Sequence, residues 1–449
     1  GDISLDGERV NITNPNDAIA QGIGMVHQHF MLIPVFTVTE NIMLGAETTR
    51  GLRLDHRAAA ARIQKLSRQY GLDVEPKTYV KSLPVGVQQR VEIIKALYRE
   101  ANILILDEPT AVLTPQEADD LFRIMRELAS RGVSIIFITH KLKEVLAVSD
   151  RITVMRDGRV VGTVAPQETN EAQLAEMMVG REVILKIEKE PVHPGEKVLH
   201  VDSLRIFDDR EMEVIRGISF FVREGEVLGI AGVQGNGQTE LVEALTGLRQ
   251  PHSGRVTMLK KDLTGKSPRS VIETGVAHIP EDRQRYGLVL PYPITDNLVL
   301  CTYYRPPFAQ NGIFNYQAID ENGHRLVKDF DVRTPSPYVS TSKLSGGNQQ
   351  KVIVARELSR PIKLLIANQP TRGLDVGSIE YIHKEIIRMR DTGCGVLLIS
   401  AELDEIMTLS DRIAVIYQGQ IMDIMQTAQA TKEQLGLLMA GVTPEHSEN

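Results

Sequence analysis

Two adjacent carboxylates, Asp107 and Glu108, follow the apolar run 103–106 and precede Pro109. Such an apolar run predicts a strand that is buried on both faces, and ligands bind at the carboxyl ends of strands in open α/β sheets. Neighbouring carboxylates are costly there unless a cation or a proton transfer accounts for them. We therefore interpret Asp107 as a Mg²⁺ ligand and Glu108 as the base that polarises water. A structural charge pair is the alternative interpretation.

The same run occurs a second time, 261 positions further along (368 minus 107), with Asn368 and Gln369 in place of the two acids. The offset also relates segments 83–89 and 150–152 to their counterparts in the second half, without a gap. A fixed offset over this distance predicts two copies of one domain.

The composition is that of a soluble globular protein, with 449 residues of which 42% are hydrophobic and 24% are charged. This length allows two or three domains, and no stretch approaches the roughly 18 apolar residues of a membrane helix. The two cysteines, Cys301 and Cys394, provide neither a disulfide framework nor a cysteine metal site, which suits the cytoplasm. A formal charge of −7 argues against a surface built mainly to bind nucleic acid.

The order of the expected elements predicts an α/β fold with a division into two domains and a short linker. We expect helices at 55–70 and 118–130, a strand at 133–139 and a hairpin at 151–164 in the first copy. The expected division is a first domain at 1–181, a linker at 182–197, a second domain at 198–441 and a polar tail at 442–449.

Two polar residues are expected near the acid pair because each follows a strand of the first copy. Gln28 comes after a short strand, where its amide could reach a metal or an attacking water, although it could equally be a polar strand end. His140 ends the strand after the acid pair and would point into the same crevice, with a structural histidine as the alternative. His27 and His29 lack zinc-finger spacing and are interpreted as surface or core histidines.

Two glycine-rich segments of the second copy could bind anions. The first follows a strand, precedes a helix at 240–248 and fits G-x-x-x-x-G-K-[ST], except that the lysine position is not lysine. Its residues are Gly232, Gly235, Gly237, Gln238 and Thr239. The second is Ser345-Gly346-Gly347, which offers a hydroxyl, bare backbone and a helix dipole to an anion.

The run Leu-Ser-Gly-Gly-Asn-Gln-Gln at 344–350, followed by a helix and the strand with the acid or amide pair, resembles the signature of the ATP-binding cassette of ABC transporters. Two fused cassettes resemble the ATPase subunit of bacterial sugar and nucleoside importers, and segments 84–89 and 367–375 look most like the nucleoside branch. The resemblance implies two tandem P-loop NTPase domains, each with a mixed sheet core and a helical subdomain.

The resemblance further implies that the protein binds ATP and Mg²⁺ and hydrolyses ATP. Its partners would be transmembrane permease subunits and, through them, a substrate-binding lipoprotein, with no nucleic acid. The protein would lie at the cytoplasmic face of the membrane.

Cassettes of this family meet head to tail, so that each ATP lies between the phosphate loop of one cassette and the signature of the other. The first composite site would therefore contain Gln28, Asp107, Glu108 and His140 with Ser345, Gly346, Gly347 and Asp375. The second would combine Gln238, Glu281, Asn368, Gln369 and Ala401 with Pro84, Val85 and Thr114, each of which departs from the family pattern.

The departures have physical consequences for the second site. Asn368 and Gln369 keep hydrogen-bonding capacity but lose the charges that attract Mg²⁺ and accept a proton. Pro84 has no N–H, and Val85 adds a branched side chain where backbone would approach phosphate. We therefore predict one hydrolytic site and one silent site, and leave open whether the silent site holds nucleotide.

The phosphate loop that would complete the first composite site has no counterpart after Gly1. We therefore expect the sequence to be an N-terminally truncated fragment that hydrolyses ATP poorly or not at all by itself. Two other function classes stay open. One is a soluble tandem-cassette ATPase that acts on ribosomes or other nucleic-acid machinery, which the short linker and acidic balance disfavour. The other is a nucleotide-binding scaffold without turnover.

Overall fold

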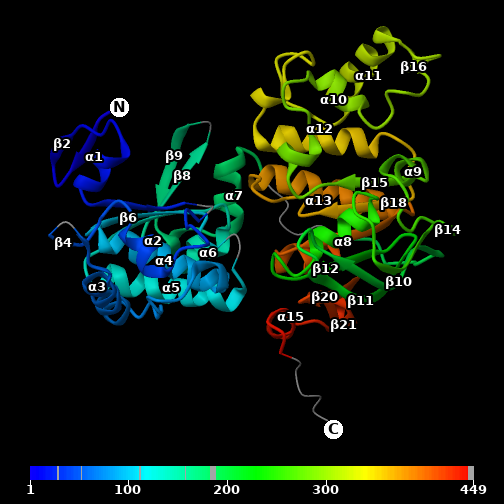
Figure 1. Cartoon of the computed structure of the whole chain (residues 1–449). Helices are drawn as coiled ribbons and strands as arrows, with labels where there is room; N and C mark the ends of the chain where they lie inside the picture. The colour runs from blue at the N-terminus through cyan, green and yellow to red at the C-terminus, as the bar shows by residue number, and fades with distance from the viewer. Residues whose placement is uncertain (28–29, 52, 111–112, 157, 183–188, 443–449) are drawn as a thin grey trace. The chain divides into compact units, whose positions relative to one another are not determined.

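The computed structural model describes residues 1–27, 30–51, 53–110, 113–156, 158–182 and 189–442. It divides the chain into two compact units, Gly1–Gly180 and Arg181–Asn449 (Figure 1). Both units contain parallel strands connected through helices, so the expected α/β class is confirmed. In the described part of the chain, no helix is both long and apolar enough to cross a bilayer.

The second unit is built on a six-stranded sheet in the order β15-β18-β19-β12-β20-β21. All neighbours in this sheet pair in parallel except β20 and β21, which are antiparallel. The sheet is therefore mixed. Its strands are β12 (Val227–Ala231), β15 (Val276–Ile279), β18 (Leu364–Asn368), β19 (Gly395–Ser400), β20 (Arg412–Tyr417) and β21 (Gln420–Gln426).

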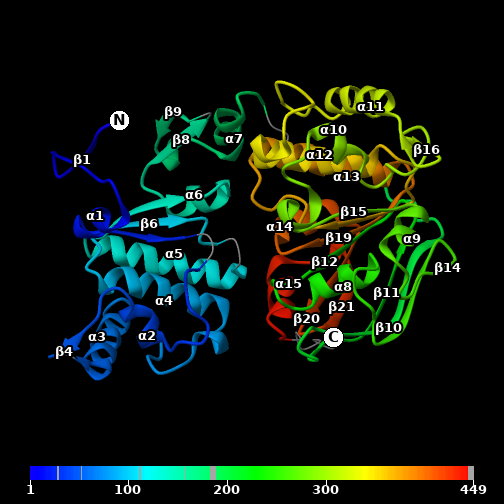
Figure 2. The same ribbon diagram turned by 45° about the horizontal axis from the view of Figure 1, so that its top comes forward.

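Both faces of this sheet are covered. One face packs with α8 (Gln238–Leu245) and a four-stranded antiparallel sheet in the order β11-β10-β13-β14. The other face packs against helices, among which α12 and α13 lie next to each other in both views (Figure 1 and Figure 2). Every residue of β12, β18 and β19 is therefore buried. The second sheet comprises β10 (Lys197–Phe207), β11 (Glu213–Arg223), β13 (Ser253–Met258) and β14 (Lys261–Asp262).

The helices on the other face include a separate helical group inserted between β15 and β18. The group contains a five-residue π-helical turn, and a two-stranded hairpin joins two of its helices. Besides α8, the unit contains the α-helices α9 (Pro268–Glu273), α10 (Ile294–Val299), α11 (Tyr316–Asp329), α12 (Gly346–Leu358), α13 (Val376–Asp391), α14 (Leu403–Leu409) and α15 (Lys432–Met439), the π-helical turn Arg283–Gly287, and short 3-10 helices at Thr341–Lys343 and Thr427–Gln429. The hairpin consists of β16 (Ala309–Gln310) and β17 (Ile313–Phe314).

The first unit has a parallel sheet in the order β3-β6-β7, and α4 and α5 lie on one side of it (Figure 2). Separate hairpins are formed by β1 with β2, β4 with β5, and β8 with β9. The strands are β1 (Ile3–Leu5), β2 (Glu8–Val10), β3 (Ile23–Val26), β4 (Thr49–Arg50), β5 (Arg53–Leu54), β6 (Ile103–Asp107), β7 (Ser134–Ile138), β8 (Ile152–Arg156) and β9 (Arg159–Val164). The helices are α1 (Pro15–Ala20), α2 (Val38–Met43), α3 (His56–Gln69), α4 (Val85–Tyr98), α5 (Pro115–Ser130), α6 (Leu142–Val148) and α7 (Glu171–Val179).

The edge of β7 is the main difference between the two units. In the second unit the corresponding strand β19 is flanked by β12, whereas no strand among described residues 1–180 pairs with that side of β7. Ile138 is consequently 47% exposed, while Ile399, at the same place in β19, is fully buried. The expectation that the strand of the acid pair is buried on both faces is wrong for β6, where buried and half-buried residues alternate.

Most expected elements of the first copy are confirmed, namely the helices α3 and α5, the strand β7 and the hairpin of β8 with β9. Residue 157, at the expected turn of that hairpin, lies outside the described residues. In the second unit, α8 begins and ends earlier than the expected helix at 240–248. The glycine loop ends at Gly237, so the helix starts directly with Gln238.

The described end of the expected linker is attached to the second unit. The Lys189 ammonium donates to the carbonyls of Leu409 and Ser410 at 3.3 and 2.9 Å. Arg390 donates to the carbonyl of Glu190. These bonds make the segment from residue 189 onward part of the second unit.

A histidine in the core sheet of the second unit is expected to make its stability depend on pH. Burial lowers the pKa of His278, on β15, from 6.5 to about 4; Glu357 opposes this shift and Arg356 adds to it. At a pH between the two pKa values, the unfolded chain binds a proton that the folded unit does not bind, so folded stability falls as pH decreases. The free energy of unfolding should fall by about 2 kcal/mol between pH 7 and pH 5 through this group.

Urea unfolding of wild type and of His278→Met at pH 7 and pH 5 measures the contribution of His278 to the unfolding free energy. Methionine is chosen because it is the residue at the matching position of β3, Met25. The variant should lose less unfolding free energy on acidification than wild type does. His200→Met, at an exposed position of β10, is the control. Equal pH dependence in all three proteins would refute the assignment.

Candidate active site

The acid pair lies where β6 ends. Asp107 is the last residue of β6, and Glu108 follows with φ of 45° while its N–H donates to the carbonyl of Ile138 on β7 at 2.9 Å. A residue other than glycine rarely adopts a positive φ, and such strained residues cluster at functional sites. The strand pairing therefore holds Glu108 in a turned conformation at the carboxyl edge of the sheet.

His140 contacts this carboxylate. It follows β7, and its Nδ1 lies 2.9 Å from Oε1 of Glu108, so the structure brings the two predicted catalytic residues together. The hydrogen bond with His140 lowers the pKa of Glu108, burial opposes the shift, and the charge of Lys141 assists it. Glu108 is therefore ionised near neutral pH, which is the state that accepts a proton.

Asp107 is half-buried and adjacent to Glu108, so a carboxylate for a cation stands beside the base. Gln28, the other predicted metal contact, lies outside the described residues.

The three predicted signature residues of the second unit lie close to Asp375, the fourth predicted residue of this unit. Ser345 precedes α12, is exposed and makes no side-chain capping bond, which leaves the first turn of the helix to another acceptor. A Cβ on Gly347 would lie 3.2 Å from Oδ2 of Asp375 and only 2.1 Å from Oγ of Ser378, so a side chain there would displace the Ser378 hydroxyl. Asp375 caps α13 by accepting from the N–H and hydroxyl of Ser378 at 2.9 and 2.8 Å.

Arg283 is a candidate that the sequence analysis missed. A Cβ on Gly346 would lie 2.7 Å from Nη2 of Arg283, so this guanidinium covers the first signature glycine. Nη1 donates to the carbonyl of Arg372 at 2.8 Å, and burial lowers the pKa of Arg283. A cation beside an uncapped helix start strengthens its attraction for an anion. In the sequence, Arg283 directly follows Glu281 and Asp282, and this position was the signal that could have identified it as a site residue.

The matching positions of the second unit share the backbone geometry but not the chemistry. Gln369 has φ of 49° and donates its N–H to the carbonyl of Ile399 at 2.8 Å, as Glu108 does to Ile138. Its side-chain oxygen accepts from the N–H of Ala401 at 3.3 Å, where the first unit has a carboxylate with His140. Neither the carboxamide of Gln369 nor the backbone of Ala401 can take a proton from water near neutral pH.

The expected strand, glycine loop and helix of the second unit are confirmed as β12, residues 232–237 and α8. Gly235 and Gly237 have φ of 92° and 99°, which favour glycine. Gln238 is the first residue of α8, and the hydroxyl of Thr239 donates to Oε2 of Glu281 at 3.2 Å.

A sequence profile of the family described as ABC transporter matches residues 1–111 and 215–372. The nucleoside import ATP-binding protein NupA of Lactococcus lactis subsp. cremoris is 52% identical over 98% of this chain and 87% of that protein. The guanosine import ATP-binding protein NupO of Bacillus subtilis is 49% identical over 100% of this chain and 88% of that protein. The glucose import ATP-binding protein TsgD13 of Haloferax volcanii is 47% identical over 98% of this chain and 86% of that protein.

The chain belongs to the ABC transporter family. Its two units are ATP-binding cassettes, and the resemblance of the signature run to this family is confirmed.

In both cassettes the helix after the signature position is bonded to the turn after the acid or amide pair. Nε2 of Gln350 donates to the carbonyl of Pro370, and Nε2 of Gln89 donates to the carbonyl of Pro109, each at 2.7 Å. Both glutamines are 2% exposed. In the sequence these glutamines only mark the repeat, whereas in the structure they hold the signature helix against the turn within each cassette.

Gln350→Ala should lower the unfolding free energy of the second cassette by about 1–3 kcal/mol, because the buried carbonyl of Pro370 loses its donor. Urea unfolding followed by circular dichroism measures the change. Gln317→Ala, at an exposed position of α11, is the matched control and should have little effect. Equal changes in the two variants would contradict the positioning role.

The first cassette's signature position is shaped differently. Pro84 precedes α4 and makes no side-chain capping bond, and a Cβ on Gly86 would lie 2.5 Å from Oε1 of Glu117. Thr114 caps α5 together with Glu117, so it takes the structural place of Asp375 without its charge.

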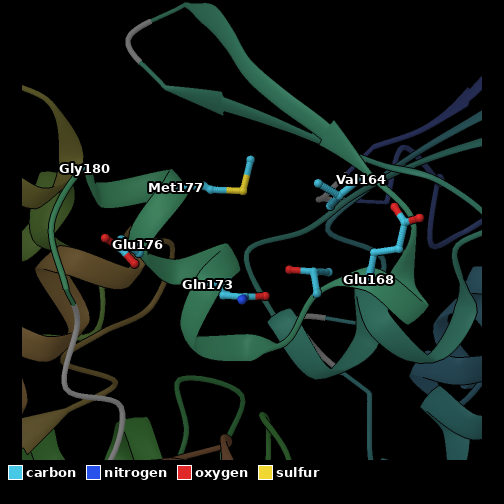
Figure 3. Close-up of a pocket in the computed structure, with 7 residues that line it drawn as sticks. Val164, Glu168, Gln173, Glu176, Met177 and Gly180 are labelled. Carbon is cyan, nitrogen blue, oxygen red and sulfur yellow. The ribbon is translucent and has the colours of Figure 1, made fainter.

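A surface hollow of about 490 Å³ lies in the first cassette, lined by the end of β9, by α7 and by the segment between them. The Met177 side chain extends from α7 toward Val164 at the end of β9, and Glu168 and Glu176 also line the hollow (Figure 3). None of its lining residues is a predicted site residue.

Proposed function

We propose that this chain is the ATP-hydrolysing subunit that powers import of a nucleoside or a sugar through separate membrane subunits, with a nucleoside favoured. The three relatives described above are named as import ATP-binding proteins, and the two with the highest identity are named for nucleoside and guanosine import. The observation that supports hydrolysis is the contact of 2.9 Å between Glu108 and His140.

The proposed hydrolytic site is a composite of the two cassettes, which pair head to tail. The residues fit MgATP chemically: Asp107 offers a carboxylate to the cation, and the uncapped start of α12 offers N–H groups to phosphate. Bound MgATP supplies the scissile phosphoanhydride and the charge of the metal. Its contacts in this proposal are Gln28, Asp107, Glu108 and His140 from the first cassette and Ser345, Gly346, Gly347 and Asp375 from the second.

Glu108 acts as the base in this site. It takes a proton from the attacking water, and the hydrogen bond with His140 holds its carboxylate in place. His140 also contacts the terminal phosphate. Ser345 and the glycines after it orient that phosphate through the hydroxyl and the helix start, and Arg283 adds a positive charge there.

The second composite site is proposed to be silent in hydrolysis. The bond between Gln369 and the backbone of Ala401 supports this, because neither residue can accept a proton from water near neutral pH. Gly232, Gly235, Gly237, Gln238 and Thr239 form its former phosphate loop.

The proposed partners are transmembrane permease subunits and, through them, a substrate-binding lipoprotein. The protein would then lie peripherally on the cytoplasmic face of the membrane. ATP closes the cassettes if it binds the closed state more tightly, and hydrolysis releases them.

Uptake by proteoliposomes that contain the full-length protein with its membrane and binding subunits tests this function. ATP-dependent accumulation of labelled nucleosides, in preference to ribose or glucose, is the expected result. Preferential sugar uptake would move the assignment to the sugar branch. Absence of uptake together with co-sedimentation with ribosomes would overturn it.

A further inference from the structure

Gln238 occupies the position of the phosphate-binding lysine, and its carboxamide is bonded within its own loop. Oε1 accepts from the N–H of Asn236 at 3.0 Å, and Nε2 donates to the carbonyl of Val233 at 3.0 Å. Nε2 also lies 2.8 Å from the place where a Cβ on Gly232 would stand. The side chain is 4% exposed, so the carboxamide fills the concave side of the loop.

A second amide of the loop fixes it to the rest of the cassette. Nδ2 of Asn236 donates to the carbonyl of Val233 at 2.9 Å, and its Oδ1 accepts from the N–H of Gln418 at 2.7 Å. The N–H of Gly419 donates to the carbonyl of Asn236 at 3.1 Å. The loop is therefore held by its own side chains and by the turn between β20 and β21.

Two of the polar groups that a phosphate would use are engaged by the protein itself. A loop of this type binds phosphate with backbone N–H groups, a lysine and a hydroxyl on the metal. Here the N–H of Asn236 is bonded to a neutral oxygen, and the hydroxyl of Thr239 donates to Glu281. A carboxylate at this place repels an incoming phosphate.

We propose that Gln238 is a built-in occupant of the second phosphate loop, whose carboxamide takes the place of phosphate oxygens and closes the loop to nucleotide. The inference rests on the proposed assignment of residues 232–239 as a former phosphate loop. The proposed effect is larger than that of the missing lysine charge alone, because a side chain that occupies the loop must be displaced before any phosphate enters.

Variants at this position separate occupancy from loss of charge. Gln238→Ala empties the loop without adding a charge, Gln238→Lys empties it and adds one, and Gln238→Glu keeps the size of the occupant and adds a negative charge. Gln238→Asn, which is too short to reach both Asn236 and Val233, replaces the alanine variant if that protein does not fold.

Photolabelling of the full chain with an azido derivative of ATP and Mg²⁺, followed by peptide mapping, measures binding at this loop. Label on peptides from 232–248 reports the second phosphate loop alone, whatever binds elsewhere. Gln238→Ala should be labelled at about fivefold lower nucleotide concentration than wild type, and Gln238→Lys at more than about tenfold lower concentration. Gln238→Glu should stay at or below the wild-type level.

Two results would overturn the proposal. One is labelling of wild type at this peptide as strong as that of Gln238→Lys, and the other is labelling of Gln238→Ala or Gln238→Asn no stronger than that of wild type. Neither depends on transport. A failed uptake experiment with the expected labelling pattern would remove the import function and leave the occupied loop in place.

Discussion

Glu108→Gln is expected to reduce ATP turnover of the full-length protein in its transporter complex by about 10²- to 10⁴-fold, the range typical of a lost general base. The substitution keeps the shape and hydrogen-bonding capacity of the side chain but removes the proton acceptor that lies 2.9 Å from His140. ATP affinity should change little, because the lost step follows binding. Phosphate release measured against ATP concentration separates the two effects, with kcat reduced and half-saturation nearly constant.

Glu321→Gln is the matched control, since it makes the same chemical change at an exposed position of α11. It should leave turnover unchanged. Turnover of Glu108→Gln within about threefold of wild type would mean that another group takes the proton. His140→Ala should also reduce turnover. The acid limb of its pH–rate profile should shift to higher pH, because the hydrogen bond that lowers the pKa of Glu108 is lost.

Ile399→Ala is expected to destabilise the second cassette by about 2–5 kcal/mol, whereas Ile138→Ala should cost the first cassette less than about 1 kcal/mol. The two residues occupy the same place in the repeat. Ile399 is fully buried between the core sheet and its antiparallel neighbour, so its removal leaves a cavity. Ile138 is 47% exposed on the open side of β7, so water replaces the lost atoms.

Urea unfolding with hydrogen exchange assigns each loss to its cassette, because peptides that contain β19 and β7 report the two sheets separately. The expected result is a large loss of protection in β19 for Ile399→Ala and a small change in β7 for Ile138→Ala. Equal losses would mean that the open edge of β7 is covered in solution.

The burial of β6 could not be predicted from its sequence. The apolar run before Asp107 has the same pattern as the run before Asn368, and both form a strand at the predicted residues. The local pattern of apolar residues indicates which faces of a strand could be buried. Whether a layer covers each face depends on distant segments, and only β18 is covered on both.

The sequence by itself determined the repeat, the family and the separation of acid and amide pairs, because these follow from residue types at short and fixed spacings. It also predicted that Glu108 and His140 meet, since consecutive parallel strands deliver their ends to one edge. Only the tertiary structure placed Arg283 over Gly346, tied Gln350 to Pro370 and turned Gln238 into its own loop. These contacts are decided by side-chain rotamers and by packing between distant segments, which no local spacing encodes.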